Sequence, residues 1–96
     1  MAQAQVKAVG LIETRGLIGA IAALDTMAKA AKVSMLSVRR VGSGLVTVII
    51  SGEVAAVQSA IEAGKSVGAS TGEEVVSANV IPRPHPDLWP ALFDPK

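Results

Sequence analysis

The chain has 96 residues, of which 50% are hydrophobic, and its nine Lys and Arg against eight Asp and Glu give a net charge of +1. So short a chain builds one hydrophobic core, and we therefore expect a single domain over residues 1–96. The sequence contains no cysteine, which excludes a disulfide framework and any cysteine-based metal site or nucleophile. Balanced charge, with Trp89 and Phe93 as the sole aromatic residues, argues against nucleic acid as a partner.

The mean hydropathy of +0.48 is high for a small soluble protein. We expect part of this apolar surface to be buried between subunits. No membrane partner is expected, because a span needs about 20 consecutive apolar residues, and Arg15, Asp25 and Lys29 interrupt the first helical candidate. Lys7 is not followed by the apolar run and cleavage site of an exported protein, so we expect an intracellular protein.

The first half of the chain predicts a strand, a helix and a second strand. Residues 6–12 mix β-branched and apolar side chains, and Glu13 and Thr14 close this first strand. After Gly16, apolar residues recur at helical spacing on one alanine-rich face, namely Leu17, Ala20, Ile21, Leu24, Ala28 and Ala31. Residues 33–41 then predict another strand.

The second half predicts a hairpin, a helix and a last strand. Gly42, Ser43 and Gly44 form a short connection to a strand at 45–51. A second helix begins near Glu53, with apolar residues at Val54, Val57, Ala60 and Ile61. A strand at 75–81 ends before two prolines, which lack the N–H that a sheet requires. Residues 86–96 predict a short turn and a C-terminal tail, whose aromatic residues cap the core or anchor a partner.

The resulting order, β-α-β-β-α-β, is that of the α+β ferredoxin-like fold: an antiparallel sheet with two helices on one face. Four segments also carry a family resemblance: GLIETRG at 10–16, DTMAKAA at 25–31, GSGLVTV at 42–48 and VIPRPH at 80–85. In these segments the chain resembles the shell proteins of bacterial microcompartments, specifically the single-domain, hexamer-forming kind. The resemblance extends from about residue 6 to about residue 88.

This resemblance implies that Gly42, Ser43 and Gly44 line a pore at a six-fold axis, with Arg40 at a position that is commonly basic. Glycines let symmetry-related loops approach an axis, and the Ser43 hydroxyl both donates and accepts hydrogen bonds. A ring of Arg40 side chains attracts anions, an effect that salt weakens. Taken alone, the same turn is an ordinary hairpin with a solvated serine. Strand alternation sends Arg39 and Arg40 to opposite faces, so only one of them shares the pore environment.

Lys29 and Arg83 fall on the family's edge lysine and edge arginine, which mediate side-by-side packing of hexamers into a flat sheet. Lysine lays its methylene stem along a neighbour, and the fork of an arginine donates to carbonyl groups across the seam. Without the resemblance, both residues are ordinary solvated cations.

No group of residues suggests catalysis. His85, between Pro84 and Pro86, has no second ligand or orienting carboxylate, and it is interpreted as making a structural hydrogen bond at a strand end. Glu13 and Thr14 are interpreted as strand-end polar residues. We therefore expect no enzyme activity, no catalytic residue, no metal and no cofactor.

The resemblance implies a structural shell subunit in the bacterial cytoplasm: a homohexamer that tiles edge to edge into shell facets and passes small polar or anionic metabolites through its pore. Implied partners are other shell proteins, including pentameric vertex proteins, and targeting peptides of enclosed enzymes are a further candidate. One alternative is a small-molecule-binding regulatory module of the same fold. Another is an acylphosphatase-like enzyme, although Glu13-Thr14-Arg15-Gly16 only weakly imitates the required anion loop.

Overall fold

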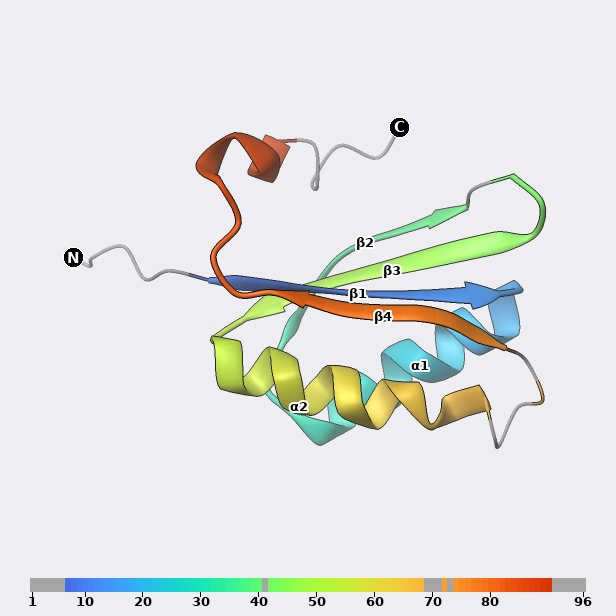
Figure 1. Cartoon of the computed structure of the whole chain (residues 1–96). Helices are drawn as coiled ribbons and strands as arrows, with labels where there is room; N and C mark the ends of the chain where they lie inside the picture. Colours follow the sequence, from blue (N-terminus) through green and yellow to red (C-terminus); the bar gives the residue numbers. More distant parts are fainter. Residues whose placement is uncertain (1–6, 41, 69–71, 73, 91–96) are drawn as a thin grey trace.

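The computed structural model describes residues 7–40, 42–68, 72 and 74–90. The elements follow the expected order (Figure 1). They are the strands β1 (Ala8–Arg15), β2 (Ser34–Arg40), β3 (Leu45–Gly52) and β4 (Val75–Ile81), the helices α1 (Leu17–Ala30) and α2 (Val54–Lys65), and a 3₁₀ turn, η1 (Pro86–Leu88). The α+β ferredoxin-like class predicted from the sequence is confirmed.

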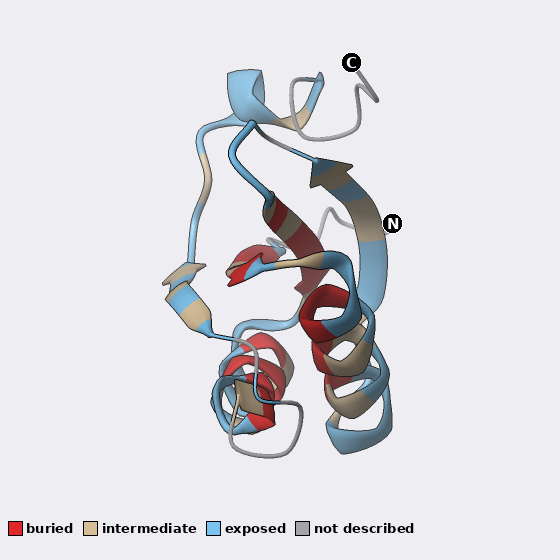
Figure 2. Cartoon of the chain, turned by 90° about the vertical axis from the view of Figure 1, so that its right-hand side faces the viewer, coloured by how far each residue is buried: buried red, intermediate tan, exposed pale blue. Residues whose placement is uncertain are grey.

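The four strands form one antiparallel sheet in the order β2-β3-β1-β4. Both helices cover one face of this sheet, and η1 lies on the other side (Figures 1 and 2). Because successive side chains of a strand point to opposite faces, Ile12, Val48 and Ile50 face the helices, whereas Leu11 and Glu13 face away. We call the side away from the helices the open face.

The core lies between the sheet and the helices. Its fully buried side chains include Ile12, Val48, Ile50, Met27 and Val57, and each such side chain stabilises the fold by about 1.5–3 kcal/mol. Glycine allows the close approach of α2 to the sheet. A Cβ at Gly64 would lie 2.5 Å from Cδ1 of Ile12, which no real pair of carbons tolerates.

The structure corrects the bounds of two predicted strands. β1 continues to Arg15, because Glu13 and Thr14 keep pairing with β3 and β4. Val33 precedes β2, whereas Val6 and Val41 lie outside the described residues.

The expected apolar face of α1 is wrong at Leu17, Ile21 and Ala28, which are exposed. The buried face consists instead of Gly19, Ala20, Ala23 and Met27. Small residues let α1 pack closely on the sheet and leave the bulkier isoleucines outside.

The C-terminal segment begins with the expected single helical turn. Pro86 occupies the first position of η1, where its missing N–H costs nothing. Trp89 is half-buried, and Phe93 lies outside the described residues. Among the described residues, the helices fall short of the length and apolarity needed to cross a membrane.

Candidate functional site

The turn between β2 and β3 has a conformation that the chain itself fixes. Ser43 and Gly44 both adopt left-handed backbone angles, with φ of 69° and 78°. For a residue with a Cβ, such as Ser43, this conformation costs about 1–2 kcal/mol. The Gly16 N–H donates a hydrogen bond of 2.9 Å to the Gly44 carbonyl oxygen, which ties the turn to the start of α1. The turn is therefore held in place by contacts within the single chain.

Gly42 differs from Gly44, because no contact among the described residues requires a glycine there. A Cβ placed on Gly42 would meet no atom within 4 Å. The space beside Gly42 is open in the single chain.

The predicted pore residues do lie together. Arg40, Gly42, Ser43 and Gly44 line one hollow of about 470 Å³. Its remaining lining comes from the start of α1 and of β3: Gly16, Leu17, Leu45 and Val46. We call residues 40 and 42–45 the pore turn, after the role predicted for them. Neither a side-chain cap nor an acidic residue occupies the first turn of α1, so the partial positive charge of the helix terminus adds to that of Arg40.

The two neighbouring arginines lie on opposite faces of the sheet, as predicted. Arg40 pairs with Val46, which is buried under the helices, whereas Arg39 pairs with Thr47 of the open face. Arg40 is exposed and Arg39 is half-buried. Only Arg40 shares the environment of the pore turn.

Lys29 and Arg83 are exposed cations on different elements. Lys29 lies in the last turn of α1 and forms an ion pair of 3.1 Å with Asp25, one helical turn earlier. Such exposed i,i+4 pairs contribute about 0.3–0.5 kcal/mol. Arg83 follows the end of β4. The described contacts of the single chain do not join Lys29 to Arg83.

The strand register places these two groups at opposite ends of the sheet. At one end of the sheet, a single row of paired residues contains Ser34, Ser51, Val9 and Ile81. β2 begins in this row shortly after α1 ends, and Arg83 follows the end of β4. The C-terminal end of α1 and Arg83 therefore lie at this end of the sheet. At the other end stand the pore turn and Gly16, where α1 begins. A strand of eight residues covers about 25 Å, which therefore separates the two ends.

His85 has the structural role expected of it. Its Nδ1 accepts a hydrogen bond of 3.1 Å from the Asp87 N–H and so caps η1. No group of three or more potential metal ligands occurs within the described ranges. The side chain of Thr14 is buried and donates to the Gly16 carbonyl oxygen at 2.9 Å, which makes Thr14 part of the support of the pore turn.

Comparison with known proteins assigns the chain to one family. The BMC domain matches residues 8–84 of the chain. The chain belongs to the BMC domain family. It is 48% identical over 84 residues to the bacterial microcompartment shell protein PduA of Citrobacter freundii, which covers 88% of this chain and 89% of PduA. It is also 47% identical over 85 residues, 88% of this chain, to CsoS1E of Prochlorococcus marinus, described as a probable carboxysome shell protein.

A solved structure supports the same assignment. The crystal structure of a microcompartment protein from Desulfitobacterium hafniense superposes with a TM-score of 0.82 and 35% identity, covering 96% of this chain. The chain spans less than half of two of these proteins, 42% of CsoS1E and 49% of the Desulfitobacterium chain.

The BMC chain described here is therefore a shell protein of the bacterial microcompartment and carboxysome type, within the bacterial cytoplasm. BMC shell proteins are structural components and not enzymes, which confirms the expectation for this chain.

One set of exposed apolar residues was not predicted from the sequence. Ile18 and Ile21 of α1 are 68% and 57% exposed, and Met35 and Val38 of β2 are also exposed. We call these four residues, two on α1 and two on the edge strand β2, the α1/β2 apolar patch. The high mean hydropathy signalled such a surface without giving its position.

Proposed function

We propose that this chain forms a cyclic hexamer with the pore turn at its axis, and that these hexamers tile edge to edge through Lys29 and Arg83. The observation that carries the proposal is the separation of the pore turn from Lys29 and Arg83 along the sheet. In a ring, one end of each subunit meets the axis and the other end forms the rim. The turn with room beside Gly42 suits the axis, and exposed, flexible cations suit the rim.

The distribution of apolar surface supports a ring. A cyclic assembly uses two different patches of each subunit, one meeting the other on the next subunit. Met35 and Val38 of the α1/β2 apolar patch lie on one edge strand of the sheet, β2, and Val76 of β4, 38% exposed, lies on the opposite edge strand. Removing such surface from water favours association by about 25 cal/mol per Å², against which stands the entropic cost of bringing subunits together.

The chemistry of the pore turn supports passage of small polar or anionic metabolites. Each subunit would contribute one Ser43 hydroxyl and the glycine backbone on both sides of it. Arg40, at the end of β2, adds a positive charge that symmetry repeats around the ring and that draws anions towards the opening.

The partners follow from the geometry of tiling. Flat six-fold tiles close into a shell only with five-fold units, so other shell proteins, including pentameric vertex proteins, complete the structure. Targeting peptides of enclosed enzymes are a further class of partner for the exposed surface.

Electron microscopy of the purified protein at moderate salt tests the proposal. Discs with six-fold symmetry, a central pit and hexagonal arrays are the expected result. Dispersed dimers or trimers would overturn it and would favour the regulatory-module alternative.

A further inference from the structure

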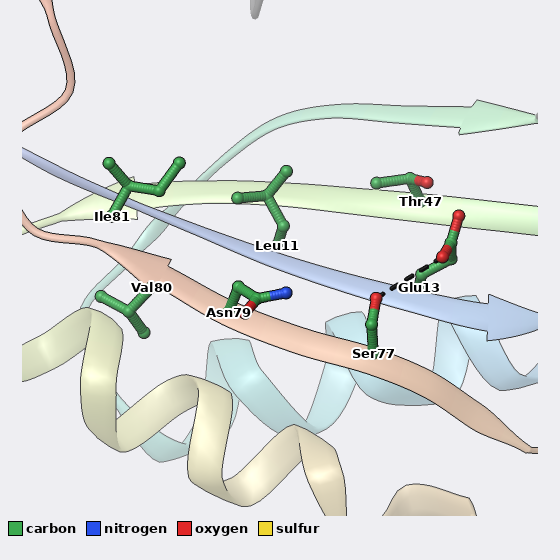
Figure 3. Close-up of a pocket in the computed structure, with 7 residues that line it drawn as sticks. All are labelled: Leu11, Glu13, Thr47, Ser77, Asn79, Val80 and Ile81. Carbon is green, nitrogen blue, oxygen red and sulfur yellow. Dashed lines mark hydrogen bonds between the residues drawn. The ribbon is translucent and has the colours of Figure 1, made fainter.

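The open face of the sheet carries a second hollow, distinct from the pore turn (Figure 3). It measures about 500 Å³ and lies over β1, β3 and β4. Its lining residues are Leu11, Glu13, Thr47, Ser77, Asn79, Val80 and Ile81. Figure 3 shows Val80 turned towards the helices, whereas Leu11, Glu13, Thr47 and Ile81 stand on the open side.

The hollow has a polar end and an apolar end. At the polar end, Glu13 stands between Thr47 of β3 and Ser77 of β4, its register partners on either side. The Ser77 hydroxyl donates to Oε1 of Glu13 at 3.5 Å. The apolar side chains of Leu11 and Ile81 lie further along the same face. Three oxygen-bearing side chains thus gather at the polar end, and a fourth, Asn79, stands beside Leu11 as its register partner on β4.

Glu13 is the one charged side chain among the described residues that line this hollow. The nearest cation along its own strand, Arg15, pairs at 3.3 Å with Glu74. Arg39 of β2 is the register partner of Thr47, on the side of β3 away from β1, and it is not part of the lining. The lining therefore presents a half-buried negative charge that no lining cation neutralises.

The chemistry of this lining selects its ligand. A single carboxylate does not hold a divalent metal, which needs several oxygen ligands in a defined geometry. A primary ammonium group has three donors, which match the Glu13 carboxylate and the hydroxyl oxygens of Thr47 and Ser77. Hydrogen bonds from an ammonium to a carboxylate are roughly twice as strong as neutral ones.

We propose that this hollow binds a small alkylammonium compound, with its ammonium group at Glu13 and its carbon chain along Leu11 and Ile81. The inference does not depend on the hexamer, because every lining residue belongs to one chain. The hollow is open to solvent, so the binding is weak, with a dissociation constant of about 1–10 mM.

Methyl NMR with n-butylammonium chloride tests this proposal. The methyl groups of Leu11 and Ile81 report on the hollow, and Ile18 on the outer surface of α1 is an internal control. Saturable shifts at Leu11 and Ile81, with Ile18 unmoved, are expected. Sodium butyrate at the same ionic strength should leave all three unchanged. Equal shifts from butyrate, or none from butylammonium, would overturn the proposal.

Two charge-removing variants test whether butylammonium binding depends on Glu13 itself or on the net charge of the protein. Glu13→Gln keeps the shape of the side chain and should weaken butylammonium binding at least tenfold. Glu62→Gln removes the same charge from the exposed side of α2, where Glu62 pairs with Lys65, and should leave binding unchanged. Equal losses in the two variants would contradict a specific site. Ser77→Ala should weaken binding by a smaller factor, because Glu13 and Thr47 remain.

Discussion

The two ends of the sheet differ in how far a single chain determines them. At the pore turn, the Gly16–Gly44 hydrogen bond, the Thr14 hydroxyl and two left-handed residues fix the backbone. At the other end, Lys29 and Arg83 are exposed, and the described contacts of Lys29 are limited to its own helix. The pore turn is thus fixed by contacts within the single chain, whereas Lys29 and Arg83, at the proposed rim, would find further partners only on a neighbouring subunit.

The largest expected effect comes from breaking the ring that would bring these two ends to the axis and the rim. Ile21→Glu places a charge in the α1/β2 apolar patch, where burial between subunits would strongly disfavour it. We expect loss of the hexamer with retained secondary structure, measured by light scattering and circular dichroism. Ile21→Val, which keeps the site apolar, should remain hexameric. A hexameric Ile21→Glu variant would remove this patch from the interface.

The next largest effect is expected on the joining of hexamers into arrays and not on the hexamer itself. Arg83→Ala removes the guanidinium fork without touching the core, since Arg83 is exposed. We expect six-fold discs that no longer join into arrays by electron microscopy. Lys65→Ala loses the same charge at the end of α2 and should still form arrays. Loss of the disc itself in Arg83→Ala would contradict a rim position.

Alanine substitutions at two glycines of the pore turn distinguish the effect of backbone conformation from the effect of available space. Gly44→Ala forces a Cβ into φ of 78°, at a cost of about 1–2 kcal/mol. Its melting temperature should fall by at least about 4–8 °C. Gly42→Ala has room in the single chain and should not lower the melting temperature. Equal or greater loss in Gly42→Ala would show that the turn conformation is not the cause.

The smallest effect on folding is expected at Lys29. Lys29→Ala breaks the exposed pair with Asp25, which changes the free energy of unfolding by only about 0.3–0.5 kcal/mol, yet it should weaken arrays. Asp25→Asn breaks the same pair but keeps the Lys29 charge, and its arrays should persist. If Asp25→Asn disrupted arrays as strongly, the ion pair itself and not the lysine would account for assembly.

The fold could be predicted from the sequence because periodicity is a local signal. The strand at 75–81 was found with its bounds correct, since prolines stop it, and the order of elements follows from such segments. The inward face of α1 could not be read correctly, because the packing of small residues against the sheet, and not hydrophobicity alone, decides which side is buried.

The candidate sites were predictable only in part. The pore turn is one contiguous segment, and the structure brings its residues together as expected. The hollow on the open face joins Glu13 to Ser77, residues 64 positions apart, which only the sheet register brings side by side. No local pattern in the sequence predicts such a pair.

The central claim is that the pore turn lies at the axis and Arg83 at the rim. Because the sequence has no cysteine, single spin labels at Ser43→Cys or Arg83→Cys can report distances within the hexamer by pulsed electron resonance. The account predicts short distances between labels at position 43. Labels at position 83 on opposite subunits should be at least about 50 Å apart, twice the length of a strand. Short distances at 83 and long ones at 43 would contradict it.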